Sequence, residues 1–327
     1  MGASRRLAAT LAIAASFSVA AGAPMTADAA SAAPQDVVVL GTATPGGGFP
    51  LYGAALAATI NEIDSSLSVT PRNTKGSTEN VPLLEAGQLD IALVQGEVAY
   101  EALSGIGRPP AALTIIAAMY STPGMFVVRA DTPYRTIGDL RGKTVAFGAR
   151  GSGLVILARY VLDGIGLDQE KDFTAVYLDR AADGPAMVMD GRVAALWGGG
   201  MGWPGFTAVA EGPAGARFIV PSAEEAARIR AKHGFLKTLT IAAGSYPGQR
   251  DAITSVGSWS FVLARPTLGD DIAYRLARAL HRGEAALAAR LPQARETTAV
   301  NTVSAAPRIA LIHPGVLRYL REIGLVQ

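Results

Sequence analysis

Two glycine-rich turns contain the residues of this sequence that are best placed to do chemistry. Thr42–Gly48 follows the apolar run Val37–Gly41, and Ala149–Gly153 follows the apolar run Thr144–Gly148. A helical pattern begins directly after each turn. The start of a helix leaves backbone N–H groups without partners and carries a partial positive charge, and glycine lets a ligand approach those donors closely. The pattern therefore predicts non-covalent binding of an anion by backbone amides.

The sequence offers few residues for catalysis. Its three histidines are scattered without the spacing of metal ligands. Ser152 is not part of a Gly-x-Ser-x-Gly nucleophile turn, because Arg150 occupies the place of the first glycine, and we expect Ser152 to cap a helix instead. The chain has no cysteine, which excludes disulfides, thiolate metal sites and a cysteine nucleophile. We expect neither an enzyme nor a bound metal or cofactor.

Two nucleotide-binding motifs come close to matching but fail on spacing. Gly148–Gly153 has the wrong glycine order for a dinucleotide fingerprint. Gly142-Lys143-Thr144 resembles the end of a phosphate-binding loop, but the upstream Gly138 is one residue too close and the lysine precedes a strand. Both interpretations are set aside.

The sequence around each turn repeats a single plan. After the turn and its helix, both copies continue with a helix end, an acidic residue, a glycine and a strand, at Leu84–Leu89 and Val188–Val193. This repetition predicts two similar α/β lobes. In open parallel sheets such turns lie at the carboxyl ends of the strands, where ligands bind. Gln95, which ends the apolar strand pattern Leu89–Gln95, is expected at that edge.

Two β-prone runs, Met125–Arg129 and Ser260–Arg265, bracket the second copy of the plan. We infer that the chain leaves the first lobe, builds the second and returns, so that two crossing strands form a hinge. A long helix at Asp271–Ala289 and a short one at Val316–Ile323 would complete the first lobe. The predicted limits are 36–129 with 257–327 for lobe I, and 130–256 for lobe II.

The first 29 residues have the pattern of an export signal. Arg5 and Arg6 precede an apolar stretch, Leu7–Ala23, and small residues suited to cleavage follow. The stretch is short for a membrane anchor and contains polar residues. We expect cleavage of a signal peptide over 1–29, a periplasmic protein and no membrane insertion after processing. The formal net charge of +2 gives no footprint for nucleic acid.

Four aromatic residues near turns and strand ends have two interpretations. Tyr52, Tyr120, Trp197 and Trp203 could pack in the cores of the lobes or form the wall of a pocket. The sequence leaves both interpretations open.

Six segments together resemble the TAXI solute receptors, which are the extracytoplasmic binding proteins of one branch of TRAP transporters. The resemblance covers nearly all of the chain after the signal, in the right order. The segments are Gly41–Gly53, Gly76–Asn80, Ala86–Gln95, Gly151–Gly153, Ala243–Gln249 and His313–Gly315.

The resemblance implies a type II periplasmic binding fold, with two α/β lobes joined by two hinge strands and closing over a small organic anion. The ligand would be a dicarboxylate or an acidic amino acid such as glutamate, delivered to TRAP transporter membrane subunits. The implied ligand contacts are Gly46, Gly47, Tyr52, Ser77, Thr78, Gln95, Ser152 and Gly153. The sequence departs from the family pattern at Gly96-Glu97, at Arg150 and in the glycine-rich segment Trp197–Trp203.

These observations support a periplasmic solute receptor that works by hinge closure. Arg150 is expected to read a second negative charge on the solute, and Tyr120 and Trp197 are added to the expected ligand-binding residues. The alternative hypothesis is an exported module that senses a solute for a signalling partner.

Overall fold

The first copy of the repeated plan folds as three parallel strands and two helices in the computed structural model, which describes residues 35–327. These elements are β1 (Asp36–Gly41), α1 (Gly48–Ile63), β2 (Leu67–Arg72), α2 (Ser77–Glu85) and β3 (Ile91–Val94). β1 lies in the middle and pairs in parallel with both β2 and β3. All four residues of β3 are buried, as expected for a parallel strand that is covered on both faces. The predicted signal peptide lies outside the described residues.

The second copy folds in the same way. Its elements are β5 (Thr144–Ala149), α4 (Gly153–Gly164), β6 (Thr174–Leu178), α5 (Asp183–Met189) and β7 (Ala195–Gly199). β5 pairs in parallel with both β6 and β7, just as β1 does with its neighbours. The internal repeat predicted from the sequence is therefore confirmed.

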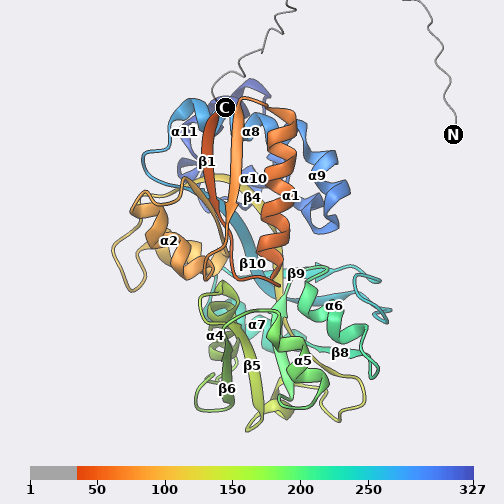
Figure 1. Cartoon of the computed structure of the whole chain (residues 1–327). Helices are drawn as coiled ribbons and strands as arrows, with labels where there is room; N and C mark the ends of the chain where they lie inside the picture. Colours follow the sequence, from red (N-terminus) through yellow and green to blue (C-terminus); the bar gives the residue numbers. More distant parts are fainter. Residues whose placement is uncertain (1–34) are drawn as a thin grey trace, which may run out of the picture. The chain divides into compact units, whose positions relative to one another are not determined.

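Two long antiparallel strands join these units (Figure 1). They are β4 (Thr114–Arg129) and β10 (Ile253–Ala264). β10 pairs with β3 and β4 pairs with β7, which gives the strand order β2-β1-β3-β10-β4-β7-β5-β6. Two further strands pair with this central pair, β8 (Ala216–Ile219) with β4 and β9 (Lys237–Ile241) with β10. Both predicted hinge strands exist, and both are longer than the sequence suggested.

The buried apolar side chains of the described residues form two clusters. One draws on residues from Val38 to Tyr120 and from Phe261 to Leu320, and the other on residues from Met125 to Val256. The change from one cluster to the other therefore falls inside β4 and β10. We name the parts around these clusters the first and second lobes; the exact limits given above stay a prediction.

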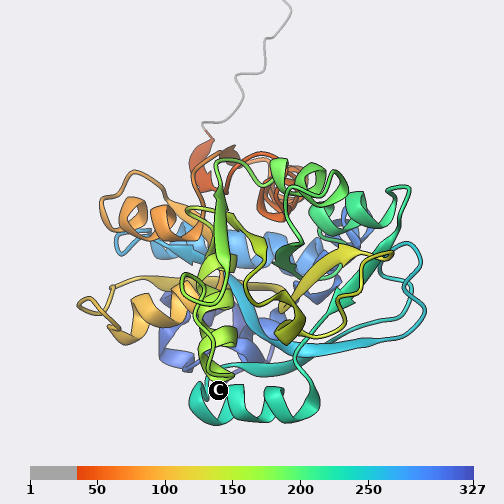
Figure 2. The same ribbon diagram turned by 90° about the horizontal axis from the view of Figure 1, so that it is seen from below.

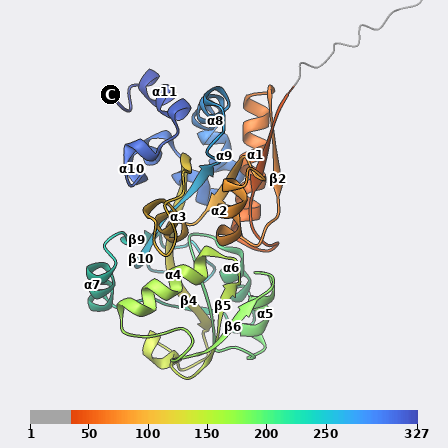
Figure 3. The same ribbon diagram turned by 90° about the vertical axis from the view of Figure 1, so that its left-hand side faces the viewer.

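Helices cover the sheets of both lobes. Besides α1 and α2, the helices of the first lobe are α3 (Gly96–Ser104), α8 (Asp270–Arg282), α9 (Glu284–Arg290), α10 (Ala299–Ala305) and α11 (Pro314–Glu322), with the short 3-10 helices η2 (Pro292–Glu296) and η3 (Ile309–Leu311). Besides α4 and α5, those of the second lobe are α6 (Pro204–Ala210) and α7 (Ala223–Lys232), with the 3-10 helix η1 (Ile137–Leu140). The C-terminal end of α4 meets α7 (Figures 2 and 3), where Gly164 allows close packing against Ile229.

One predicted helix is divided in two. The sequence pattern suggested a continuous helix over Asp271–Ala289, but α8 ends at Arg282 and α9 begins at Glu284. Gly283 lies between them, and its amide donates back to the carbonyl oxygen of Ala279 at 2.9 Å. Glycine is a poor helix former because it loses much backbone entropy when it is fixed, so the helix divides there.

Candidate ligand-binding site

Three helix starts meet at a cavity between the two lobes. α1 and α2 begin there from the first lobe, at Gly48 and Ser77, and α4 begins there from the second lobe, at Gly153. The cavity is small and partly open to solvent: the centre of a water-sized sphere can occupy about 50 Å³ of it. Among the described residues, the amides of Gly48, Ser77 and Gly153 have no hydrogen-bond partner. The arrangement can present backbone donors from both lobes to one anion.

One end of the cavity is rich in hydrogen-bond donors. Gln95 follows β3 and precedes α3, and its side chain is 3% exposed. Its Nε2 atom makes no hydrogen bond of normal geometry to the described residues, although the Gln95 side chain lies close enough to the Glu97 carboxyl to lower the pKa of that group. The hydroxyl oxygen of Ser77 accepts from the amide of Gln95 at 3.0 Å, so the hydroxyl hydrogen of Ser77 is available to a ligand. A buried amide without a partner costs free energy, and a ligand acceptor at this point would remove that cost.

The helix α4 reaches this end because a glycine stands at its first position. A Cβ atom on Gly153 would lie 2.5 Å from the Cβ of Gln95 and 3.1 Å from the hydroxyl of Ser77. Ser152 caps the helix, and its hydroxyl accepts from the amide of Leu154 at 3.2 Å. The cap predicted from the sequence is confirmed.

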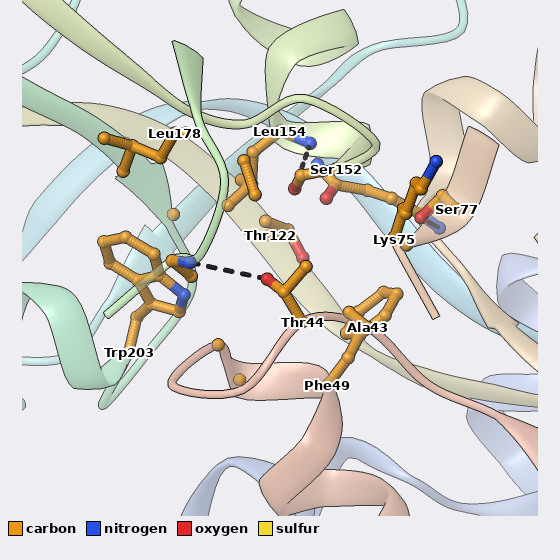
Figure 4. A pocket seen from close by; sticks show the side chains of 18 of the residues that line it. Ala43, Thr44, Phe49, Lys75, Ser77, Thr122, Ser152, Leu154, Leu178 and Trp203 are labelled. Carbon is orange, nitrogen blue, oxygen red and sulfur yellow. Dashed lines mark hydrogen bonds between the residues drawn. The ribbon is translucent and has the colours of Figure 1, made fainter. Parts of the chain in front are cut away.

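The opposite end of the cavity is largely apolar (Figure 4). Lys75 and Ser77 lie on one side, whereas Trp203 and Leu178 lie on the other, and Thr44 stands between them. Trp203 precedes α6 and is buried. Its indole lies near Tyr120: a Cβ atom placed on Gly48 would be 3.3 Å from the indole and 3.6 Å from the Tyr120 hydroxyl.

A tyrosine outside the cavity fixes the position of Trp203. The amide of Trp203 donates to the phenolic oxygen of Tyr246 at 3.0 Å, and the hydroxyl of Tyr246 donates to the carbonyl oxygen of Gly200. Tyr246 itself is buried against Phe206 and Phe218. The glycine-rich loop that carries Trp203 is therefore held at both ends by one side chain.

The cavity contains little charge. Lys75 is the one charged residue in its lining, and its side chain is exposed at the rim. Burial raises the pKa of Tyr120 far above its usual value, so its hydroxyl stays neutral. In the described part of the chain, no group of three histidine, cysteine, aspartate or glutamate side chains could hold a metal ion.

Five of the residues predicted to bind ligand line this cavity, and the structure brings them together from both lobes. They are Gly47, Ser77, Gln95, Tyr120 and Ser152. Gly153 stands beside them against Gln95, between the lining residues Ser152 and Leu154. Their role in binding stays a prediction.

The other predicted residues lie outside the lining. Gly46 packs against Ala182 of the second lobe, and Thr78 donates to Gly151. Tyr52 is fully buried in the first core, where its hydroxyl bonds to Thr297 at 3.0 Å. Each of these residues contacts other protein atoms and does not line the cavity.

Trp197 and Arg150 also have protein partners. Trp197 is fully buried in the second core, where its indole nitrogen donates to the carbonyl oxygen of Leu154 at 2.8 Å. Arg150 is exposed and its guanidinium lies 5.8 Å from the centre of the Tyr177 ring. The interpretation of Trp197 as a core aromatic thus fits the structure better than that of a pocket wall, whereas Tyr120 and Trp203 do line the cavity.

Sequence reasoning missed Lys75, Phe49 and Thr122, which also line the cavity. Lys75 could have been found, because it directly precedes the Gly76-Ser77 helix start. Thr122 lies in the middle of β4, and only the pairing of the crossing strands brings it to the site.

Solved structures share this fold. A protein from Bordetella bronchiseptica RB50 has a TM-score of 0.55 at 14% identity, covering 88% of this chain and 98% of that one. A structure described as a periplasmic transporter has a TM-score of 0.53 at 13% identity, covering 79% of this chain and 87% of that one. The alkanesulfonate-binding protein SsuA from Xanthomonas axonopodis pv. citri, bound to MOPS, has a TM-score of 0.49 at 20% identity, covering 89% and 85%. The first two of these structures confirm the predicted fold class, the two-lobed α/β fold of periplasmic binding proteins.

None of the helices in residues 35–327 is long and apolar enough to cross a membrane. The sequence pattern of the NMT1-like family matches residues 40–324, which include both lobes and nearly all of the described chain. The protein therefore belongs to the NMT1-like family.

Proposed function

We propose that this protein is a periplasmic solute receptor that captures a small organic anion between its lobes without converting it. The observation that carries the proposal is Gln95, a buried residue in the lining of a cavity where three helix starts meet, whose side-chain Nε2 has no hydrogen-bond partner among the described residues. Two independent sources of donors, a side chain and helix termini, thus favour a negatively charged ligand.

Contacts between the lobes support a binding mechanism by closure. The hydroxyl of Thr78 donates across to Gly151 at 3.0 Å, and Tyr160 of the second lobe donates to Glu101 of the first at 2.9 Å. The rings of Tyr100 and Phe235 stack across the lobes with centres 4.0 Å apart. A ligand held by both lobes would add to these contacts, exclude water and shift the population toward the closed form.

We further propose that the receptor serves a TRAP-type transporter, as the resemblance to TAXI receptors implies. Several segments that carry the resemblance lie at the cavity: Gly41–Gly53 and Gly76–Asn80 contribute lining residues, and Gln95 ends a third segment. Tyr246, which accepts a hydrogen bond from the amide of Trp203, belongs to a fourth segment, Ala243–Gln249. The ligand class implied by the resemblance includes dicarboxylates and acidic amino acids such as glutamate.

A thermal-shift screen against small carboxylates, amino acids and sulfonates tests the binding proposal. A ligand that binds only the folded protein raises the melting temperature in a concentration-dependent way. We expect at least one organic anion to do so. A chain that no organic anion stabilises, but that an uncharged solute does, would contradict the proposal.

A further inference from the structure

We infer that the solute is a monocarboxylate with an apolar tail, bound with its carboxylate at the Ser77 end of the cavity and its tail against Trp203. This inference rests on the proposed function and narrows it, because it excludes a second carboxylate on the solute. The argument depends on how polar and apolar groups are divided between the two ends.

The Ser77 end can satisfy one carboxylate. It offers the unpartnered amide nitrogen of Gln95, the hydroxyl of Ser77 and the free backbone amides of Ser77 and Gly153. A carboxylate has two oxygens that together accept about four hydrogen bonds. The donors at this end therefore match a single carboxylate, and the rim ammonium of Lys75 adds one compensating charge.

The Trp203 end offers surface for an apolar tail. Trp203, Leu178 and Ala181 line it, and the first two are large side chains fixed in the second lobe. The phenol of Tyr120, the indole of Trp203 and the free amide of Gly48 each carry one neutral donor at this end, and the pKa of Tyr120 is raised by burial. This end thus has no cation that could compensate a carboxylate.

A dicarboxylate would be penalised by this division. Its second carboxylate would lie among apolar side chains, and burial of a charge without a counter-ion is strongly unfavourable. Arg150, the residue that the sequence suggested as a second cation, is directed to the Tyr177 ring outside the cavity lining. The competing possibility is that the α1 start at Gly48, together with Tyr120, accepts the second carboxylate.

Matched pairs of ligands separate these possibilities. Hexanoate and adipate have the same chain length and differ by one carboxylate, as do butanoate and succinate. Hexanamide is the uncharged counterpart of hexanoate. Affinities for the five compounds are measured by calorimetry with the wild-type protein, and with Lys75→Met and Trp203→Leu.

We expect hexanoate to bind at least about ten-fold more tightly than adipate, because adipate would bury a second charge without a partner. The same margin is expected over hexanamide, which has one acceptor oxygen and leaves donors at the Ser77 end unpaired. Hexanoate should bind about fifteen-fold more tightly than butanoate, since each buried methylene contributes about four-fold. Trp203→Leu should weaken hexanoate more than butanoate. Lys75→Met should weaken both by about the same factor, up to about five-fold, because the lysine is exposed.

Adipate and succinate binding more tightly than their monocarboxylate partners would overturn the inference and leave the anion receptor standing. Equal affinities for hexanoate and hexanamide would overturn the placement of the carboxylate. If none of the five compounds binds and the wider screen finds no organic anion either, the proposed function itself fails, and the inference with it. Circular dichroism and melting curves of both variants show that they fold.

Discussion

The carbonyl oxygen of Gly151 in the second lobe accepts two hydrogen bonds from Thr78 in the first, one from its amide at 3.2 Å and one from its hydroxyl at 3.0 Å. Thr78 is the second residue of α2, and Gly151 lies in the turn before α4. One backbone atom thus joins the starts of two helices that face the same cavity. At this point the backbones of the two lobes lie so close together that there is little room for added atoms.

Gly151→Ala tests the importance of that approach. A Cβ atom at this position would lie 2.5 Å from the carbonyl oxygen of Lys75, so the lobes would have to separate. Overpacking of this kind costs about 1–3 kcal/mol. If this cost destabilises only the closed form, the affinity for ligand drops by about 5- to 150-fold. Calorimetry measures this loss. Gly234→Ala is the control, because a Cβ there has no neighbour within 4 Å; equal effects of both changes would contradict the account.

Gln95→Met removes the unpartnered Nε2 donor and keeps the length of the side chain. Loss of one hydrogen bond to a charged group costs about 1.5–3 kcal/mol, so affinity for the anion should fall by roughly 10- to 150-fold. The melting temperature without ligand should stay the same or rise, since a buried unpartnered amide is removed. The exposed Gln88→Met is the matched control. Unchanged affinity in Gln95→Met would remove the observation on which the proposed function rests.

Arg150→Ala should change the affinity for mono- and dicarboxylates alike by no more than about two-fold, because a solvent-exposed charge is screened. The sequence suggested the opposite, namely that Arg150 reads a second negative charge. Calorimetric titration of the variant with hexanoate and adipate distinguishes the two. A selective loss of adipate binding would restore the interpretation made from the sequence.

Glu97 makes stability depend on pH. Its side chain is fully buried at the start of α3, and burial raises its pKa to about 7. A hydrogen bond that its Oε1 accepts from the hydroxyl of Ser258 at 2.6 Å opposes this shift but does not cancel it. The folded protein therefore holds this proton at pH values where the unfolded chain has lost it. Stability from this group is fully present below about pH 4.5 and is lost as the pH rises to about 7.

Glu97→Gln should remove this dependence. In the wild type, the free energy of unfolding contributed by Glu97 falls by about 3 kcal/mol between these pH values, and the variant should lack that fall. Urea denaturation at pH 4.5, 6 and 8 measures it. Glu224→Gln, at an exposed position on α7, is the control and should follow the wild type. A slope retained in Glu97→Gln would show that other groups cause it.

Much of the fold could be predicted from local sequence signals. The two glycine turns and the apolar runs before them placed β1, β5, α1 and α4, because strand and helix patterns with glycine boundaries are determined by near neighbours in the chain. The division of the long helix at Gly283 was missed, because a single glycine within a helical pattern is often tolerated.

The site was predicted only in part, for a physical reason. Ser152 follows from the turn signal before α4, whereas Ser77 was implied only by the family resemblance. The apolar end depends on contacts between distant segments: Tyr246 holds Trp203 across 43 positions. Trp197 and Trp203 occupy one glycine-rich segment, yet one lies in the core and the other lines the cavity, which the pattern of residue types could not distinguish.

The most direct test of the central claim is nuclear magnetic resonance of protein labelled with ¹⁵N at serine and glycine, titrated with hexanoate or with whichever anion the screen finds. The amides of Ser77 in the first lobe and Gly153 in the second should shift together, with one dissociation constant, because both donate to the same carboxylate. Shifts confined to one of the two amides, or absent at a saturating anion concentration, would contradict the account.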